Sequence, residues 1–80
     1  MIRLKVKEIL EEQGKTQSWL ARKSQVPDAL VRRMIREPTS YHPTLPTLVS
    51  IAKALRVRIE DLYEELPDDE DEAPSPPTPS

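Results

Sequence analysis

The residues of this 80-residue chain that are best placed to do chemistry are three closely spaced arginines, Arg32, Arg33 and Arg36. If residues 28–36 form a helix, a step of about 100° per residue puts these arginines, Asp28 and Ala29 within one arc of about 140°. A face with three guanidinium groups and one carboxylate is cationic and offers no nucleophile with a neighbouring base. It is suited to binding an anionic partner.

The segments around these arginines are predicted to form short helices. The side of residues 28–36 opposite the arginines is apolar, being made up of Leu30, Val31, Met34 and Ile35. Residues 17–24 form the preceding helix in this prediction, and the tight turn between the two completes a helix-turn-helix. Helices are also predicted over residues 6–13, 45–55 and 59–66, and no hairpin signal is present. The sequence therefore predicts an all-α domain of five helices.

Turn and capping residues mark the ends of the predicted helices. Gly14, the only glycine, follows the first helix, where a left-handed residue is favoured. Thr16 is a suitable N-cap for the second helix, and Thr44 for the fourth. Pro27 fits the start of the third helix, where its missing N–H is not needed.

Composition excludes several classes of protein. Hydrophobic residues make up 36% of the chain and charged residues 32%, which suffices for one small domain. With no Cys and one His, the chain has no disulfide, no thiolate nucleophile and no Cys- or His-only metal site. No apolar run reaches the roughly 18–20 residues of a membrane span, and the start lacks a signal-peptide pattern. We therefore expect a soluble, cytoplasmic binding module that is not an enzyme and needs no cofactor.

Charge is distributed unevenly along the chain. All 12 Lys and Arg residues lie within residues 1–58, together with five of the 14 acids, so this part carries a net charge of +7. The other nine acids fall in residues 60–72. Residues 67–80 are acidic and rich in proline, with Ala73 as the only other apolar side chain. We predict a folded domain over residues 1–66 and a disordered tail over residues 67–80.

The order and spacing of several motifs resemble the lambda-repressor/Cro-type (XRE) helix-turn-helix family. The resemblance extends from about Val6 to Tyr63. The first part of it is Leu10-Glu11-Glu12-Gln13-Gly14-Lys15-Thr16-Gln17, followed by Leu20-Ala21, Val26 and the pair Val31/Met34. The second part is Thr44-Leu45, Thr47-Leu48, Ile51-Ala52-Lys53-Ala54-Leu55, Val57 and Asp61-Leu62-Tyr63.

The resemblance implies a compact five-helix, lambda-repressor-like domain that binds DNA. Its third helix enters the major groove while its second helix braces against the DNA backbone. Gln17 matches a glutamine that contacts phosphate in the family, and the positions that face DNA are Pro27, Asp28, Ala29, Arg32 and Arg33. Where the family usually has glycine in three turns, this chain has Gln25, Glu37 and Arg56, so we expect these turns to differ or to be strained.

On the basis of this resemblance, Arg32, Arg33 and Arg36 are interpreted as the residues that recognise the DNA. Arginine can donate two hydrogen bonds to guanine O6 and N7, which contributes about 1–3 kcal/mol of discrimination between bases. We expect one or two of the three to contact bases, with Arg36 contacting phosphate. The alternative is a solvated helix face. Burial of this face, or pairing of its arginines with neighbouring acids, would argue against the DNA-binding role.

The other predicted contacts have structural alternatives. Asp28 complements the helix dipole and can orient Arg32 one turn later, with acceptance from cytosine N4 as the less favoured role. Ala29 can touch a thymine methyl group. Thr16, Gln17 and Ser18 open the second helix, whose N–H groups suit a phosphate oxygen, and capping by Thr16 is compatible with this.

Other exposed residues have simpler interpretations. Trp19 is expected to lie partly exposed over neighbouring side-chain stems, with contact to a sugar-phosphate or a partner subunit as the alternative. Solubility and long-range attraction to DNA account for the lysines, which are Lys5, Lys7, Lys15, Lys23 and Lys53. The acidic run of residues 68–72 is interpreted as solvation, with competition against DNA as a further hypothesis.

The sequence therefore predicts a sequence-specific, double-stranded DNA-binding transcriptional regulator, a repressor that acts as a homodimer. The predicted DNA-contacting residues are Thr16, Gln17, Ser18, Pro27, Asp28, Ala29, Arg32, Arg33 and Arg36. The predicted dimer surface is the corner around residues 56–58. One alternative is an antitoxin whose tail folds on a toxin; another is a helix-turn-helix fold reused for protein interaction.

Overall fold

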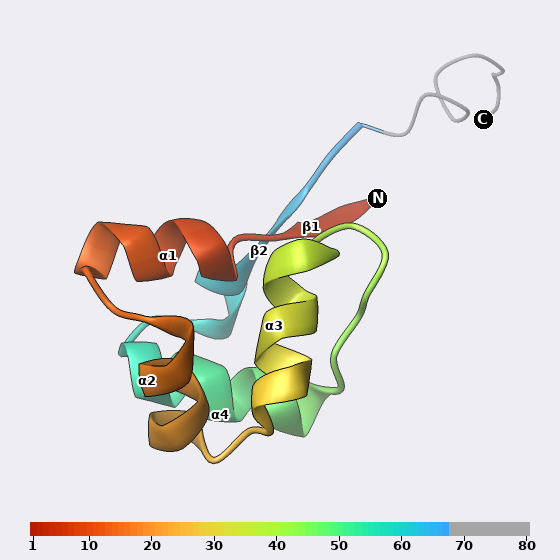
Figure 1. Cartoon of the computed structure of the whole chain (residues 1–80). Helices are drawn as coiled ribbons and strands as arrows, with labels where there is room; N and C mark the ends of the chain where they lie inside the picture. The colour runs from red at the N-terminus through yellow and green to blue at the C-terminus, as the bar shows by residue number, and fades with distance from the viewer. Residues whose placement is uncertain (68–80) are drawn as a thin grey trace, which may run out of the picture.

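The computed structural model describes residues 1–67 (Figure 1). In chain order its elements are β1 (Ile2–Leu4), α1 (Val6–Gln13), α2 (Gln17–Ser24), α3 (Asp28–Arg36), α4 (Leu45–Leu55), the 3₁₀ turn η1 (Ile59–Leu62) and β2 (Tyr63–Glu65). The helices predicted over residues 6–13, 17–24, 28–36 and 45–55 are confirmed. The tail predicted over residues 67–80 lies outside the described residues, except for Pro67.

A single core holds the helices together. Each helix contributes one apolar side, and α2 packs against both α3 and α4. The largest fully buried side chains are Leu20, Met34, Ile51, Leu55, Leu62, Val6 and Val31. On α4, Leu45 in the first turn does not join the core, because it is 63% exposed. Thr44 occupies the N-cap position of α4, but its hydroxyl meets that of Thr47 at 3.1 Å instead of capping the backbone.

Two of the three turns without glycine adopt the left-handed conformation. Gln25 after α2 has φ 61° and Arg56 after α4 has φ 59°, close to the 67° of Gly14. Glu37 after α3 has φ −128° and is not left-handed. Side chains in the left-handed region are disfavoured by contact between Cβ and the following carbonyl, so Gln25 and Arg56 are strained and Glu37 is not.

The all-α prediction is wrong at the two ends of the domain, where β1 and β2 form a small antiparallel sheet. Ile2 faces Glu65, Arg3 faces Glu64 and Leu4 faces Tyr63. The predicted fifth helix over residues 59–66 is instead the turn η1 followed by β2. The spacing of apolar residues there is helix-like, but the last backbone groups pair with the start of the chain.

Hydrogen bonds and ion pairs fasten this sheet to the helices. The Lys5 N–H donates to the Leu62 carbonyl at 2.7 Å, and the Leu66 N–H donates to that of Met1 at 2.7 Å. The Arg3 guanidinium donates to Glu64 on β2 and to Glu8 on α1, each at 2.7 Å. The sheet therefore joins the two ends of the domain and anchors both to α1.

None of the helices within residues 1–67 is long and apolar enough to cross a membrane.

Candidate nucleic-acid interface

Helix α3 is fixed in rotation by its apolar side. Pro27 takes the N-cap position with φ −53°, and its carbonyl accepts from the N–H groups of Leu30 and Val31. Val31 and Met34 are fully buried, at 0% and 1% exposure. The opposite side of α3 is in solvent. The predicted separation of an apolar and a cationic side is therefore confirmed.

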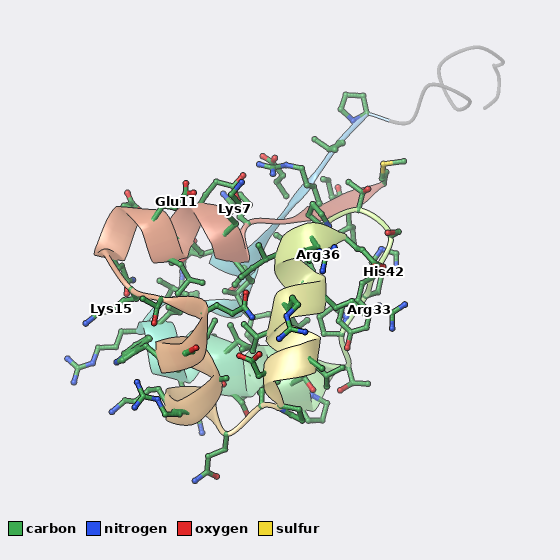
Figure 2. All side chains as sticks on the ribbon, in the orientation of Figure 1. Lys7, Glu11, Lys15, Arg33, Arg36 and His42 are labelled. Carbon is green, nitrogen blue, oxygen red and sulfur yellow. The ribbon has the colours of Figure 1, made fainter. Side chains whose placement is uncertain are left out.

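The exposed side forms what we call the arginine face, consisting of Asp28, Ala29, Arg32, Arg33, Arg36 and Glu37. Five of its members, all but Asp28, line a shallow hollow of about 260 Å³. Arg33 and Arg36 lie along α3 in Figure 2. Three guanidiniums and two carboxylates give this face a net charge of +1.

Asp28 connects the start of α2 to the middle of α3. Its carboxylate accepts from Arg32 Nη2 at 2.9 Å, one turn later on the same helix. The same carboxylate is approached by Gln17 Nε2 from α2 at 3.4 and 3.5 Å, at the long end of hydrogen bonding. The orienting role predicted for Asp28 is consistent with this geometry, because the Arg32 guanidinium is held along the exposed side of α3.

Arg33 is held in a different way. Its Nε donates to Glu37 at 3.3 Å, and its guanidinium lies 4.7 Å from the centre of the Tyr41 ring, a cation–π contact with the loop after α3. Arg36 is exposed, and no carboxylate lies within ion-pair distance of it in residues 1–67. The three arginines therefore differ in how firmly each is positioned.

Arg32 and Arg33 are each paired with an acid on the same helix face. From the sequence, such pairing is expected to argue against a DNA-binding role. Both pairs are exposed, with 51% and 43% of the Arg32 and Asp28 side chains accessible, and 53% and 46% for Arg33 and Glu37. Exposed pairs of this kind contribute about 0–1 kcal/mol and are weakened by salt. A bidentate contact with guanine contributes about 1–3 kcal/mol, so these pairs can be exchanged for a ligand.

The start of α2 lies beside the arginine face. The Trp19 N–H donates to Thr16 Oγ1 at 3.0 Å, which confirms Thr16 as the N-cap. No acceptor within residues 1–67 is found for the N–H groups of Gln17 and Ser18. The geometry thus connects Gln17 with Asp28 and Arg32. In the described part of the chain, Thr16, Ser18 and Pro27 make no hydrogen bond to the three arginines.

The comparisons with known proteins identify the fold. Residues 6–62, more than half of the chain, match the family model described as Helix-turn-helix. The chain belongs to the lambda-repressor-like (XRE) helix-turn-helix family. Membership implies DNA binding, typically in a transcriptional regulator, and the family is non-enzymatic. The search of curated proteins gives no match.

This helix-turn-helix domain has a second cationic surface, which sequence analysis missed. We call it the Trp19 surface, and its members are Lys15, Trp19, Arg22, Lys23, Lys53 and Arg56. They line three hollows that share Lys23. The spacing of Lys15, Trp19 and Lys23, four residues apart, is a signal that could have identified its α2 side. The α4 side, with Lys53 and Arg56, is brought there only by tertiary packing.

Proposed function

We propose that this helix-turn-helix domain is a sequence-specific double-stranded DNA-binding protein that represses transcription, with α3 in the major groove. The observation that carries the proposal is the rotation of α3. Burial of Val31 and Met34 turns Arg32, Arg33 and Arg36 together into solvent. A short helix that displays several guanidiniums beside a preceding helix is the geometry that reads base edges.

The contacts divide into reading and positioning. Arg32 and Arg33 contact bases, and Pro27 and Ala29 approach the same base edges from the start of α3. Arg36 contacts phosphate at the other end of α3. Asp28 keeps Arg32 extended toward the groove and accepts no hydrogen bond from a base.

Phosphate contacts from α2 set the register of α3 on the duplex. The side chain of Gln17 and the N–H groups of Gln17 and Ser18 donate to phosphate oxygens, while Thr16 holds the first turn in place. These contacts add affinity for any sequence.

A homodimer accounts for the affinity that one small domain lacks. A helix of nine residues is about 13–14 Å long and covers about four base pairs. A two-fold dimer places two such helices about 34 Å apart on successive turns of DNA. Occupancy of a duplex site by such a dimer excludes other proteins from that site, and this is the mechanism of the repression that we propose.

Binding-site selection from random duplexes, followed by affinity measurements on the selected duplex, tests this function. The double variant Arg32→Ala and Arg33→Ala should lose at least about 100-fold in affinity, because two bidentate contacts are removed. The helical circular-dichroism signal should not change, since both side chains are exposed. Gln17→Ala should weaken binding to all sequences alike.

The matched control is Lys5→Ala with Lys7→Ala, which removes the same charge from the start of α1. It should lower affinity for selected and random duplexes equally and only slightly. If the arginine variant behaves like this control, or if no sequence is enriched, the proposed function is wrong.

A further inference from the structure

The Trp19 surface is strongly cationic, unlike the arginine face. Its five cations carry a charge of +5, and no carboxylate of residues 1–67 lies within 4.0 Å of any of them. All five are exposed. The arginine face carries only +1, because Asp28 and Glu37 are part of it. An acidic ligand is therefore attracted more strongly to the Trp19 surface.

The shape and chemistry of this surface suit a peptide. Trp19 is half-buried, and Lys15 Nζ lies 4.8 Å from the centre of the indole ring. Ala54 and Leu55 also line this hollow but are buried, so its accessible apolar area comes mainly from the Trp19 ring. A half-buried aromatic ring surrounded by separate cations matches a peptide with several carboxylates.

A duplex bound to α3 does not cover the Trp19 surface. Gln17 points toward Asp28 on α3. At about 100° per residue, Trp19 and Lys23 project some 120–160° away from Gln17 around α2. Figure 2 shows Lys15 at one edge of the molecule, separated from Arg33 and Arg36. This surface remains accessible when α3 is occupied.

The chain contains a segment that complements this surface. Residues 68–72, outside the described residues, are Asp-Asp-Glu-Asp-Glu and carry five negative charges. Leu66, two residues before this segment, is paired with Met1 at the far end of the sheet. We propose that the Trp19 surface binds residues 68–72 of a second copy of this chain, and that two such contacts form a reciprocal dimer.

Chain length is the reason for choosing a second copy. From Met1 the chain runs through β1 and α1 in one general direction before it reaches Lys15 (Figure 1). That path is about 20–25 Å long by the rise of a strand and of a helix. At a rise of at most about 3.6 Å per residue, Asp68 lies within about 7 Å of Leu66 and Glu72 within about 22 Å, so the five acids of one chain cannot all reach its own Trp19 surface. In a pair of chains, each segment reaches the other copy, and two identical contacts close the assembly.

Sedimentation of the full chain at low and high salt tests the proposal. At about 0.05 M salt the chain should dimerise, and at about 0.5 M salt it should be monomeric, because contacts between exposed charges are screened. Lys15→Glu with Lys23→Glu should weaken the dimer about tenfold or more. Neutralising the segment by Asp68→Asn, Asp69→Asn, Glu70→Gln, Asp71→Asn and Glu72→Gln should have the same effect. The control Lys5→Glu with Lys7→Glu, which changes charge equally outside the surface, should dimerise like the unmodified chain.

Two further measurements locate the contact. Trp19 is the only tryptophan, so its fluorescence should change with protein concentration along the same curve as the dimer. When the chain with Asp68→Asn, Asp69→Asn, Glu70→Gln, Asp71→Asn and Glu72→Gln is mixed with the Lys15→Glu, Lys23→Glu chain, one intact contact is available, between the Trp19 surface of the first and residues 68–72 of the second. The two should therefore associate, although each alone is impaired in dimerisation. Such complementation requires direct contact between the segment and the surface.

Several results would overturn the proposal. These are a monomer at low salt, a dimer that survives neutralisation of residues 68–72, or a Trp19 signal that responds to a random duplex and not to protein concentration. The last result would assign the surface to nucleic acid. Arg32→Ala with Arg33→Ala should leave dimerisation unchanged, so failure of this proposal and failure of the proposed DNA function are distinguishable.

Discussion

The two cationic surfaces of this domain differ in the groups that contact their cations. On the arginine face, Arg32 is paired with Asp28, and Arg33 lies between Glu37 and the Tyr41 ring. On the Trp19 surface, Lys15 makes a cation–π contact with the Trp19 ring, and no carboxylate of residues 1–67 is in ion-pair range of its cations. The first arrangement lowers net charge and fixes side-chain direction. The second keeps the charge and has no carboxylate that fixes side-chain direction.

This difference separates two uses of positive charge. Reading a base edge depends on the angle of a guanidinium, so acids that orient it are useful even though they repel phosphate. Attracting a flexible acidic chain depends on the number of charges, and orienting acids would only weaken it. Four predictions test this contrast, beginning with the largest expected effect.

Reversing one charge on each surface gives the sharpest comparison. Arg36→Glu should weaken binding to the selected duplex about 100-fold, because it replaces a phosphate contact by repulsion. Lys53→Glu makes the same change of charge on the Trp19 surface and should weaken it only about twofold to threefold, through long-range attraction. Equal losses in a direct binding assay would show that both surfaces contact the same duplex.

Removing Asp28 and Glu37 one at a time tests whether each acid orients its arginine or merely neutralises the charge of that arginine. Asp28→Asn should raise affinity for random duplexes a few-fold and reduce discrimination by about tenfold, because Arg32 loses its partner. Glu37→Gln should raise random affinity similarly but keep discrimination, since Tyr41 still holds Arg33. Competition between selected and random duplexes measures both quantities. Retained discrimination in the Asp28 variant would remove the orienting role.

The left-handed turns beside each surface offer a test of stability. Gln25→Gly in the turn before α3 and Arg56→Gly on the Trp19 surface should each raise the free energy of unfolding by about 1 kcal/mol, because glycine relieves a disfavoured φ. Glu37→Gly is the control. Its φ of −128° needs no glycine, and that variant should be less stable. Denaturant unfolding measures all three, and equal effects would show that conformation at these turns is not limiting.

Arg3 allows a comparison of a paired and an unpaired carboxylate away from both surfaces. Its expected effect, on the pH dependence of stability, is the smallest of the four. The hydrogen bond of Arg3 to Glu8 holds the pKa of that carboxyl below its ordinary value of 4.5. Stability from this pair is therefore complete above about pH 4.5 and is lost as the pH falls through the lower pKa of the folded state. Glu8→Gln should flatten the acid limb of a plot of Tm against pH. Glu12→Gln, on the same helix and without an ion pair among residues 1–67, should not flatten it.

Local signals predicted the helices well. Gly14 ends α1, Thr16 caps α2 and Pro27 precedes α3, each for a reason contained within a few neighbouring residues. The sheet was missed because strands of three residues have no readable period, and because Leu66 pairs with Met1 at the opposite end of the chain. Helix-like spacing over residues 59–66 was therefore misread as a fifth helix.

In the candidate site, too, contacts within one helix were predictable from the sequence, and contacts between separate elements were not. The rotation of α3 and the contact of Asp28 with Arg32 follow from spacing along one helix. The contact of Arg33 with Tyr41 depends on how the loop after α3 folds, and no local pattern indicates that. The Trp19 surface joins α2 to α4, so its charge becomes visible only when the helices are packed. Whether the nine predicted residues contact DNA remains a prediction.

The pairing of β1 with β2 has a practical consequence for engineering. It brings the amino group of Met1 within 3.4 Å of the Leu66 carbonyl, so the chain enters and leaves the domain at one point. A short linker across that point, with new ends opened in the loop between α3 and α4, would give a circularly permuted domain with the same core. The same arrangement lets the domain be inserted into a loop of a host protein without separating the flanking host segments.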